Sequence, residues 1–107
     1  MTTMADTRAR VTAGVDTHLD VHVVAALDGI GGELGVRSFP TTPAGYRKLL
    51  GWLRSFGDVD VVGVEGTCSY GAGLTRHLLA EGIAVVEVDR PNRQNRRPPP
   101  PSDPDPR

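Results

Sequence analysis

Two acidic residues stand at the ends of apolar stretches, where a carboxylate is costly to keep unless something binds it. Asp16 follows the apolar run that begins at Val11, and Glu65 ends the run "VDVVGVE". Each acid comes two residues after a glycine, Gly14 or Gly63, so a missing side chain on the same strand face is expected to leave room beside it. Carboxylate oxygens are the ligands that Mg²⁺ prefers. If the two stretches lie side by side, the acids predict a metal site.

Carboxylates that share divalent cations suit chemistry on phosphodiesters. Two such ions roughly 3.5–4 Å apart can activate a water and hold the leaving oxygen. The segment "GTCSYGAG" follows Glu65 and leads into a predicted helix, whose N–H groups are candidates for contact with a phosphate. A single acid at a strand end is most often only solvated, so a solvated pair is the alternative to the metal site.

Three apolar segments in the first part of the chain are predicted strands. They cover residues 11–17, 20–28 and 33–39 and are joined by short links. The glycines of "GIGG" form the second link, because glycine adopts the positive φ that tight turns need. Strands with such short links are expected to pair as an antiparallel meander.

The next part of the chain alternates helices with strands. A helix is predicted to begin after Thr42, a good N-cap with Pro43 at the first helical position, and to end by Gly57. Its apolar face repeats at helical spacing and consists of Tyr46, Leu49, Leu50, Leu53 and Phe56. A strand over 59–65, a helix over 70–81 and a strand over 83–89 follow.

The order β-β-β-α-β-α-β predicts an α/β, ribonuclease-H-like fold, in which right-handed crossovers make the later strands parallel. In this fold the strands that carry Asp16 and Glu65 are parallel neighbours, about 4.8 Å apart. Their two carboxylates are then able to converge on one cation.

Composition limits the class of protein. A chain of 107 residues with 38% hydrophobic content allows one modest domain, and a net charge of −1 gives no overall attraction to nucleic acid. The one cysteine, Cys68, fits a reducing cytoplasm, and no apolar run approaches the ~20 residues of a membrane helix. We expect a cytoplasmic protein with a disordered N-terminus (1–10), a folded domain (11–89) and an Arg/Pro-rich disordered tail (90–107).

Four segments of the chain are informative together: "GVDTHLDVHVVAALD", "SFPTTPAGYRKLLGWLRSFG", "VGVEGTCSYGAGLTRHL" and "VVEVDRPNRQNRR". In sequence and in order they resemble the N-terminal, RuvC-like domain of the DEDD transposases, the insertion-sequence family one-ten. The resemblance implies a Mg²⁺-dependent enzyme of DNA transposition and recombination. It also implies that Asp16 and Glu65 are its first two metal-binding, catalytic acids.

The resemblance is less complete at the end of the chain, in "PPPPSDPDPR". The family's second pair of acids lies in a motif of the form Ser-Asp-Pro-x-Asp-Ala that opens a helix. Ser102, Asp103 and Pro104 match it, which implies that Asp103 is a third catalytic and metal-binding acid. The fourth acid would fall at Pro106, and Asp105 stands one position early. We therefore expect a truncated domain that lacks the C-terminal catalytic helix and is inactive alone.

The resemblance also implies partners: DNA, an element-encoded guide RNA, and an intact transposase as oligomer partner. A group of arginines before the tail is predicted to contact a nucleic-acid backbone, namely Arg90, Arg93, Arg96 and Arg97. The alternative function is a non-catalytic remnant that binds nucleic acid or an intact transposase. A more distant alternative is a nucleotide-binding fold of the sugar-kinase and actin type, but those proteins have Asp-x-Gly where this chain has Asp16-Thr17-His18.

Overall fold

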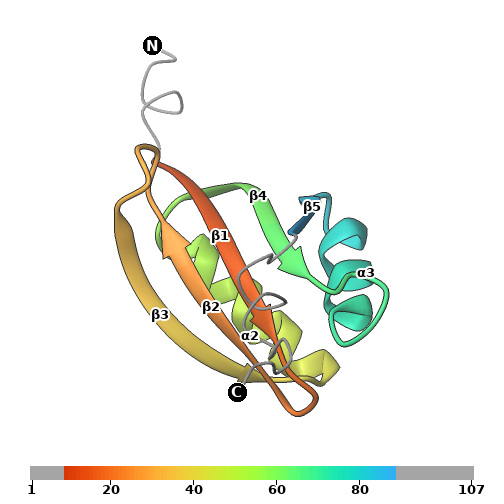
Figure 1. The fold of residues 1–107 in the computed structure, drawn as a ribbon. Helices are drawn as coiled ribbons and strands as arrows, with labels where there is room; N and C mark the ends of the chain where they lie inside the picture. The colour runs from red at the N-terminus through yellow and green to blue at the C-terminus, as the bar shows by residue number, and fades with distance from the viewer. Residues whose placement is uncertain (1–8, 89–107) are drawn as a thin grey trace, which may run out of the picture.

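The structure, a computed structural model, describes residues 9–88. Five strands form one sheet in the order β3-β2-β1-β4-β5, and two helices pack against it (Figure 1). In chain order the elements are β1 (Arg10–Thr17), β2 (Val21–Leu27), β3 (Glu33–Pro40), α2 (Pro43–Arg54), β4 (Asp58–Glu65), α3 (Ala72–Ala80) and β5 (Ala84–Val88).

The pairing of the strands confirms the predicted fold. β1 to β3 form an antiparallel meander, whereas β1 pairs parallel with β4 and β4 pairs parallel with β5. This mixed sheet has ribonuclease-H-like topology, and its element ends differ from the predicted ones by at most three residues. The predicted tails, 1–10 and 90–107, lie outside the described residues except that β1 already begins at Arg10. No helix in residues 9–88 is long and apolar enough to cross a membrane.

The start of α2 is determined by its own sequence. The Thr42 hydroxyl accepts a hydrogen bond from the Gly45 N–H at 3.0 Å, and Pro43 takes the first helical position, as predicted. Gly45 is required here, because a Cβ atom on it would lie 2.0 Å from the Pro40 carbonyl oxygen at the end of β3. The first turn of α2 is therefore pressed directly against the strand that precedes it.

One hydrophobic core lies between the helices and the sheet. It takes alternate residues from the strands and the inner faces of both helices, and its buried members include Val15, Val24, Phe39, Leu49, Leu53, Val64, Leu74 and Leu78. The opposite face of the sheet is partly open: Val36 and Val86 each expose more than half of their surface. Asp16 and Glu65 alternate with core residues of β1 and β4, so they belong to this second face.

A histidine lies inside the core. His22 of β2 is fully buried and stacks on the Tyr46 ring of α2, with ring centroids 6.1 Å apart. Within residues 9–88, neither of its ring nitrogens has a hydrogen-bond partner of good geometry. Burial lowers the pKa of His22 from its usual 6.5, an effect that the backbone of Val21 only partly offsets. The folded protein therefore favours neutral His22.

This histidine predicts a loss of stability in mild acid. In the unfolded chain His22 takes up a proton near pH 6.5, and in the folded protein it does so only at lower pH. The free energy of unfolding is therefore unaffected by His22 above pH 6.5 and falls as the pH drops below that value. His22→Phe keeps an aromatic ring on Tyr46 and should remove this part of the fall. In urea unfolding at pH 7.5, 6 and 5, we expect the two proteins to diverge by at most about 1.4 kcal/mol per pH unit. Parallel pH profiles would contradict the assignment.

Candidate metal centre

The register of β1 and β4 brings the two predicted acids together. Gly14 pairs with Gly63, and Val15 pairs with Val64. Asp16 and Glu65 come one residue later, at the carboxyl ends of parallel strands that lie about 4.8 Å apart. Residues at matching positions of parallel neighbours point to the same face. The two carboxylates therefore share one edge of the sheet and its open face.

The two carboxylates differ in exposure. The Asp16 side chain keeps 31% of its surface exposed, and its Oδ2 lies 3.4 Å from Nε2 of His18. Glu65 is only 7% exposed. Asp16 is thus within reach of a ligand from solvent, whereas Glu65 is held within the fold. His18 was not predicted at this edge, although its position two residues after Asp16 in a tight turn was an available signal.

The space beside the acids differs from the prediction at one of the two glycines. An added Cβ on Gly14 would meet no described atom within 4 Å, so this position leaves room as expected. At Gly63 the expectation is wrong, because an added Cβ would lie 2.6 Å from Cγ2 of Val88. Gly63 is needed for close packing against β5, which no pattern within β4 could reveal.

The backbone at Glu65 is tied to the neighbouring strand. The Thr17 hydroxyl donates a hydrogen bond of 3.0 Å to the Glu65 carbonyl oxygen, and Thr17 is buried. Thr17 follows Asp16 directly, so one bond couples the segments that carry the two acids. Because it is shielded from water, this bond is costly to lose.

A second tie acts on the turn that follows Glu65. The Glu87 carboxylate of β5 accepts hydrogen bonds from the N–H groups of Gly66 at 3.2 Å and Thr67 at 3.0 Å, and from the Thr67 hydroxyl. These bonds, first of all those from Thr67, lower the pKa of Glu87. Gly66 has a φ of +64°, a left-handed conformation that glycine adopts at least cost. Glu87 and Gly66 together define how the chain leaves β4.

The predicted phosphate contact concerned the N–H groups at the start of α3 and stays a prediction, but the turn that comes before α3 in "GTCSYGAG" has a different role. The N–H groups of Gly66 and Thr67 point to the chain's own carboxylate, and the N–H of Gly71 donates to the Gly66 carbonyl oxygen at 2.8 Å. The anion at this turn is Glu87. It was missed because Glu87 lies 20 residues further along the chain than Thr67.

The remaining predicted site residues lie beyond the part that the structure describes. They are Asp103, Arg90, Arg93, Arg96 and Arg97. Within residues 9–88, no group of three or more His, Cys, Asp or Glu side chains is arranged to hold a metal ion. Asp16 and Glu65 fit a hard cation by ligand type and by their shared edge, as two members of a larger ligand set.

The sheet order, with acids at the ends of the parallel neighbours β1 and β4, defines a domain of the ribonuclease-H-like class. Residues 13–99 match the family model of the IS110 DEDD transposases, described as a transposase. This match covers most of the 107 residues, and the chain belongs to that family. Membership implies binding to DNA, and DEDD transposases typically depend on metal ions. No curated protein matches the chain at a significant level.

The bond between Thr17 and Glu65 predicts a loss of stability when it is removed. Thr17→Val keeps the shape of the side chain but deprives the buried Glu65 carbonyl oxygen of its donor, and should lower the free energy of unfolding by about 1–2 kcal/mol. Thr12→Val is the matched control, because Thr12 lies on the same strand and on its less buried face. Urea unfolding measures both. Equal stability of the Thr17→Val variant and the wild type would contradict the role of this bond.

The tie at Glu87 predicts a titration that is visible at two backbone amides. Since the pKa of Glu87 is lowered, its bonds are present above that pKa and are lost as the pH falls through it. In NMR spectra the Gly66 and Thr67 amide signals should shift together with a midpoint below 4.5, the usual value of a glutamate. Glu87→Gln should abolish the transition. A midpoint at or above 4.5 would show that the carboxylate does not receive these bonds.

Proposed function

We propose that this chain is the metal-binding part of a transposase that acts on DNA strands, and that Asp16 and Glu65 are its first two metal ligands. The observation that most supports the proposal is the parallel register of β1 and β4, which gives both carboxylates one edge and one face of the sheet. Family membership supplies the reaction class, DNA transposition.

The surroundings of the acids support unequal roles. Asp16, partly open to solvent, is the ligand that an incoming ion and its phosphodiester would meet. Glu65 is buried, and its backbone is held by the Thr17 hydroxyl. Glu87 fixes the turn that follows. A ligand that is held in place before the ion arrives loses little conformational freedom on binding.

A bound Mg²⁺ would supply positive charge that activates a water and stabilises the leaving oxygen of a phosphodiester. Asp16 and Glu65 would hold that ion through their carboxylate oxygens. The space beside Asp16 is free, because no described side chain fills the position above Gly14.

Two acids are only part of the DEDD set, so we propose that the chain alone is inactive and depends on further ligands and partners. Asp103 is the proposed third metal-binding and catalytic acid. DNA-backbone contacts are assigned to the segment that follows β5, at Arg90, Arg93, Arg96 and Arg97. The proposed partners are DNA, an element-encoded guide RNA and an intact transposase.

A non-catalytic role is the second candidate, and one sequence feature favours it. Pro106 stands where the resembled motif has its fourth acid, and proline cannot be a metal ligand through its side chain. In that case the domain would bind nucleic acid or an intact transposase without cutting DNA. The two candidates differ in whether metal-dependent strand cleavage appears when those partners are supplied.

For the isolated chain we expect weak binding of Mn²⁺ or Mg²⁺ that depends on both acids. Asp16→Asn and Glu65→Gln should each weaken Mn²⁺ binding by at least about tenfold, as measured by titration calorimetry or by loss of the free Mn²⁺ EPR signal. Asp60→Asn is the control, since Asp60 is an exposed acid of β4 that pairs with Arg10 at 2.9 Å. Tight binding that survives both substitutions would rule out the assigned site.

We also expect the chain alone not to cleave DNA. Supercoiled plasmid incubated with the protein and Mn²⁺ should stay supercoiled, because the described residues hold two of the acids needed for strand cleavage. Metal-dependent nicking that disappears in the Asp16→Asn variant would overturn this expectation and would show a complete centre.

A further inference from the structure

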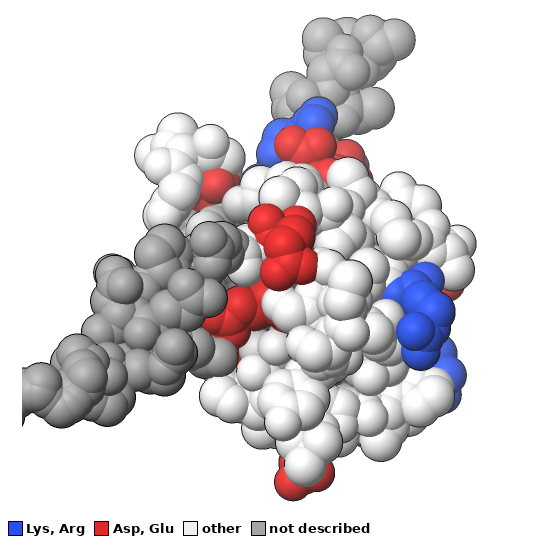
Figure 2. Space-filling view, turned by 45° about the vertical axis from the view of Figure 1, so that its right-hand side comes forward, with Lys and Arg blue, Asp and Glu red and all other residues white. Residues whose placement is uncertain are grey.

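The two helices form a basic layer in a chain whose net charge is −1. Neither α2 nor α3 contains an acidic residue, and their exposed cations are Arg47, Lys48, Arg54 and Arg76. The acids lie instead in the strands and turns. Figure 2 shows the main basic group at the edge of the view, apart from the acidic side chains near its centre.

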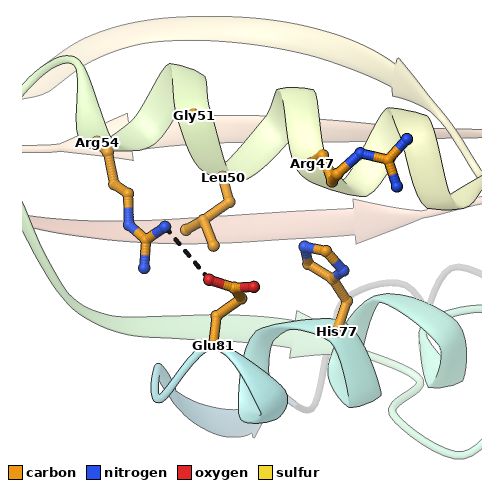
Figure 3. Close-up of a pocket in the computed structure, with 6 residues that line it drawn as sticks. All are labelled: Arg47, Leu50, Gly51, Arg54, His77 and Glu81. Atoms are coloured by element: carbon orange, nitrogen blue, oxygen red, sulfur yellow. Dashed lines mark ion pairs between the residues drawn. The ribbon is translucent and has the colours of Figure 1, made fainter.

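A hollow of about 220 Å³ lies between the helices within this layer. It is lined by Arg47, Leu50, Gly51, Arg54, His77 and Glu81. In Figure 3, Leu50 projects from α2 toward α3, and His77 projects from α3 toward α2. Arg54 and Glu81 reach toward each other at one end of the gap, with 3.5 Å between Nη1 and Oε1.

The positions of the two arginines suit an extended anion. Arg47 and Arg54 are seven residues apart on α2, which places them on one helix face about 10 Å apart along the axis. Glu81 is the one acid at the hollow among the described residues, and it pairs with Arg54 while about half exposed. The charge at Arg47 is not balanced there. A ligand with several negative groups along its length can use both ends of the hollow.

Gly51 lines the hollow and is not needed by the fold. It lies inside α2 and is exposed, and an added Cβ would meet no described atom within 4 Å. Glycine inside a helix is less favourable than alanine, so local stability does not explain this residue. Its effect is to leave the backbone of α2 accessible between the two arginines.

We propose that this hollow binds the phosphate groups of a nucleic-acid strand through Arg47 and Arg54, with His77 on the facing wall. Guanidinium groups donate several hydrogen bonds to phosphate oxygens. A nucleic-acid strand is the polyanion that the family's reaction presents. The site lies on the helical layer, away from the open sheet face that carries Asp16 and Glu65. It rests on family membership and not on the proposed metal centre, so either can fail without the other.

The test is the affinity of the full chain for a fluorescein-labelled single-stranded DNA, measured by anisotropy over a range of salt concentrations. Arg47→Gln and Arg54→Gln should each raise Kd about three- to ten-fold and reduce the salt slope by about 1. Arg37→Gln is the matched control, because it removes the same charge from β3, where Arg37 lies over the Phe39 ring. It should bind as the wild type does.

Three further variants distinguish loss of this site from loss of folding. Glu81→Gln removes the acid that pairs with Arg54 and should tighten binding. Gly51→Leu should weaken binding by filling the hollow while raising Tm, whereas Gly51→Ala should raise Tm and leave Kd nearly unchanged. Single-stranded RNA of the same sequence should bind through the same residues. Tighter binding of either the RNA or the DNA would identify the natural ligand.

Unchanged Kd in both arginine variants would overturn the proposal. An equal loss of affinity in the Arg37→Gln variant would also overturn it, because the DNA would then be attracted by the overall charge of the protein and not by this hollow. A response of the Gly51 and His77 amide signals to inorganic phosphate but not to the oligonucleotide would also overturn the assignment to a strand.

Discussion

The parallel pairing of β1 with β4 determines that the two acids at the ends of these strands lie side by side. The register sets Gly14 beside Gly63 and Val15 beside Val64, so the next residue on each strand is an acid on the open face. A shift by one residue would reverse the faces of the strand, burying the acid against the helices and exposing a valine of the core. Burial of Val15 and Val64 under α2 and α3 therefore enforces the same register that brings Asp16 to Glu65.

The edge of the sheet is stabilised by contacts that leave its solvent side open. Thr17 binds the carbonyl oxygen of Glu65 from β1, and Glu87 binds the following turn from β5. Two strands, β1 and β5, thus hold one short segment at the end of β4. Glu87 also occupies N–H groups that would otherwise attract an external anion. The anionic groups of a DNA strand are then expected near a bound cation or near arginines, and not at this turn.

The two helices differ in charge from the strands and turns. The helices contain only basic and neutral residues, whereas the strands and turns hold the acids. A metal ion at the open face would locally reverse the sign of the charge at Asp16 and Glu65. In the proposed arrangement the domain would offer positive charge to a polyanion at two places, one that needs an ion and one that does not. Binding of a strand at the helices would then be independent of the metal.

The sequence by itself determined which segments form helices and strands and that two acids stand at strand ends. Helical spacing and the Thr42-Pro43 start predicted α2, the short glycine-containing links predicted the meander, and Asp16 and Glu65 stood out at strand ends. These signals are local, because they depend on backbone preferences and on the periodicity of neighbouring residues. Only the tertiary structure decided three other features: Val88 over Gly63, Glu87 on Gly66 and Thr67, and the hollow between α2 and α3. Each joins segments that are distant in the chain, and which side chains meet there follows from the packing of whole elements.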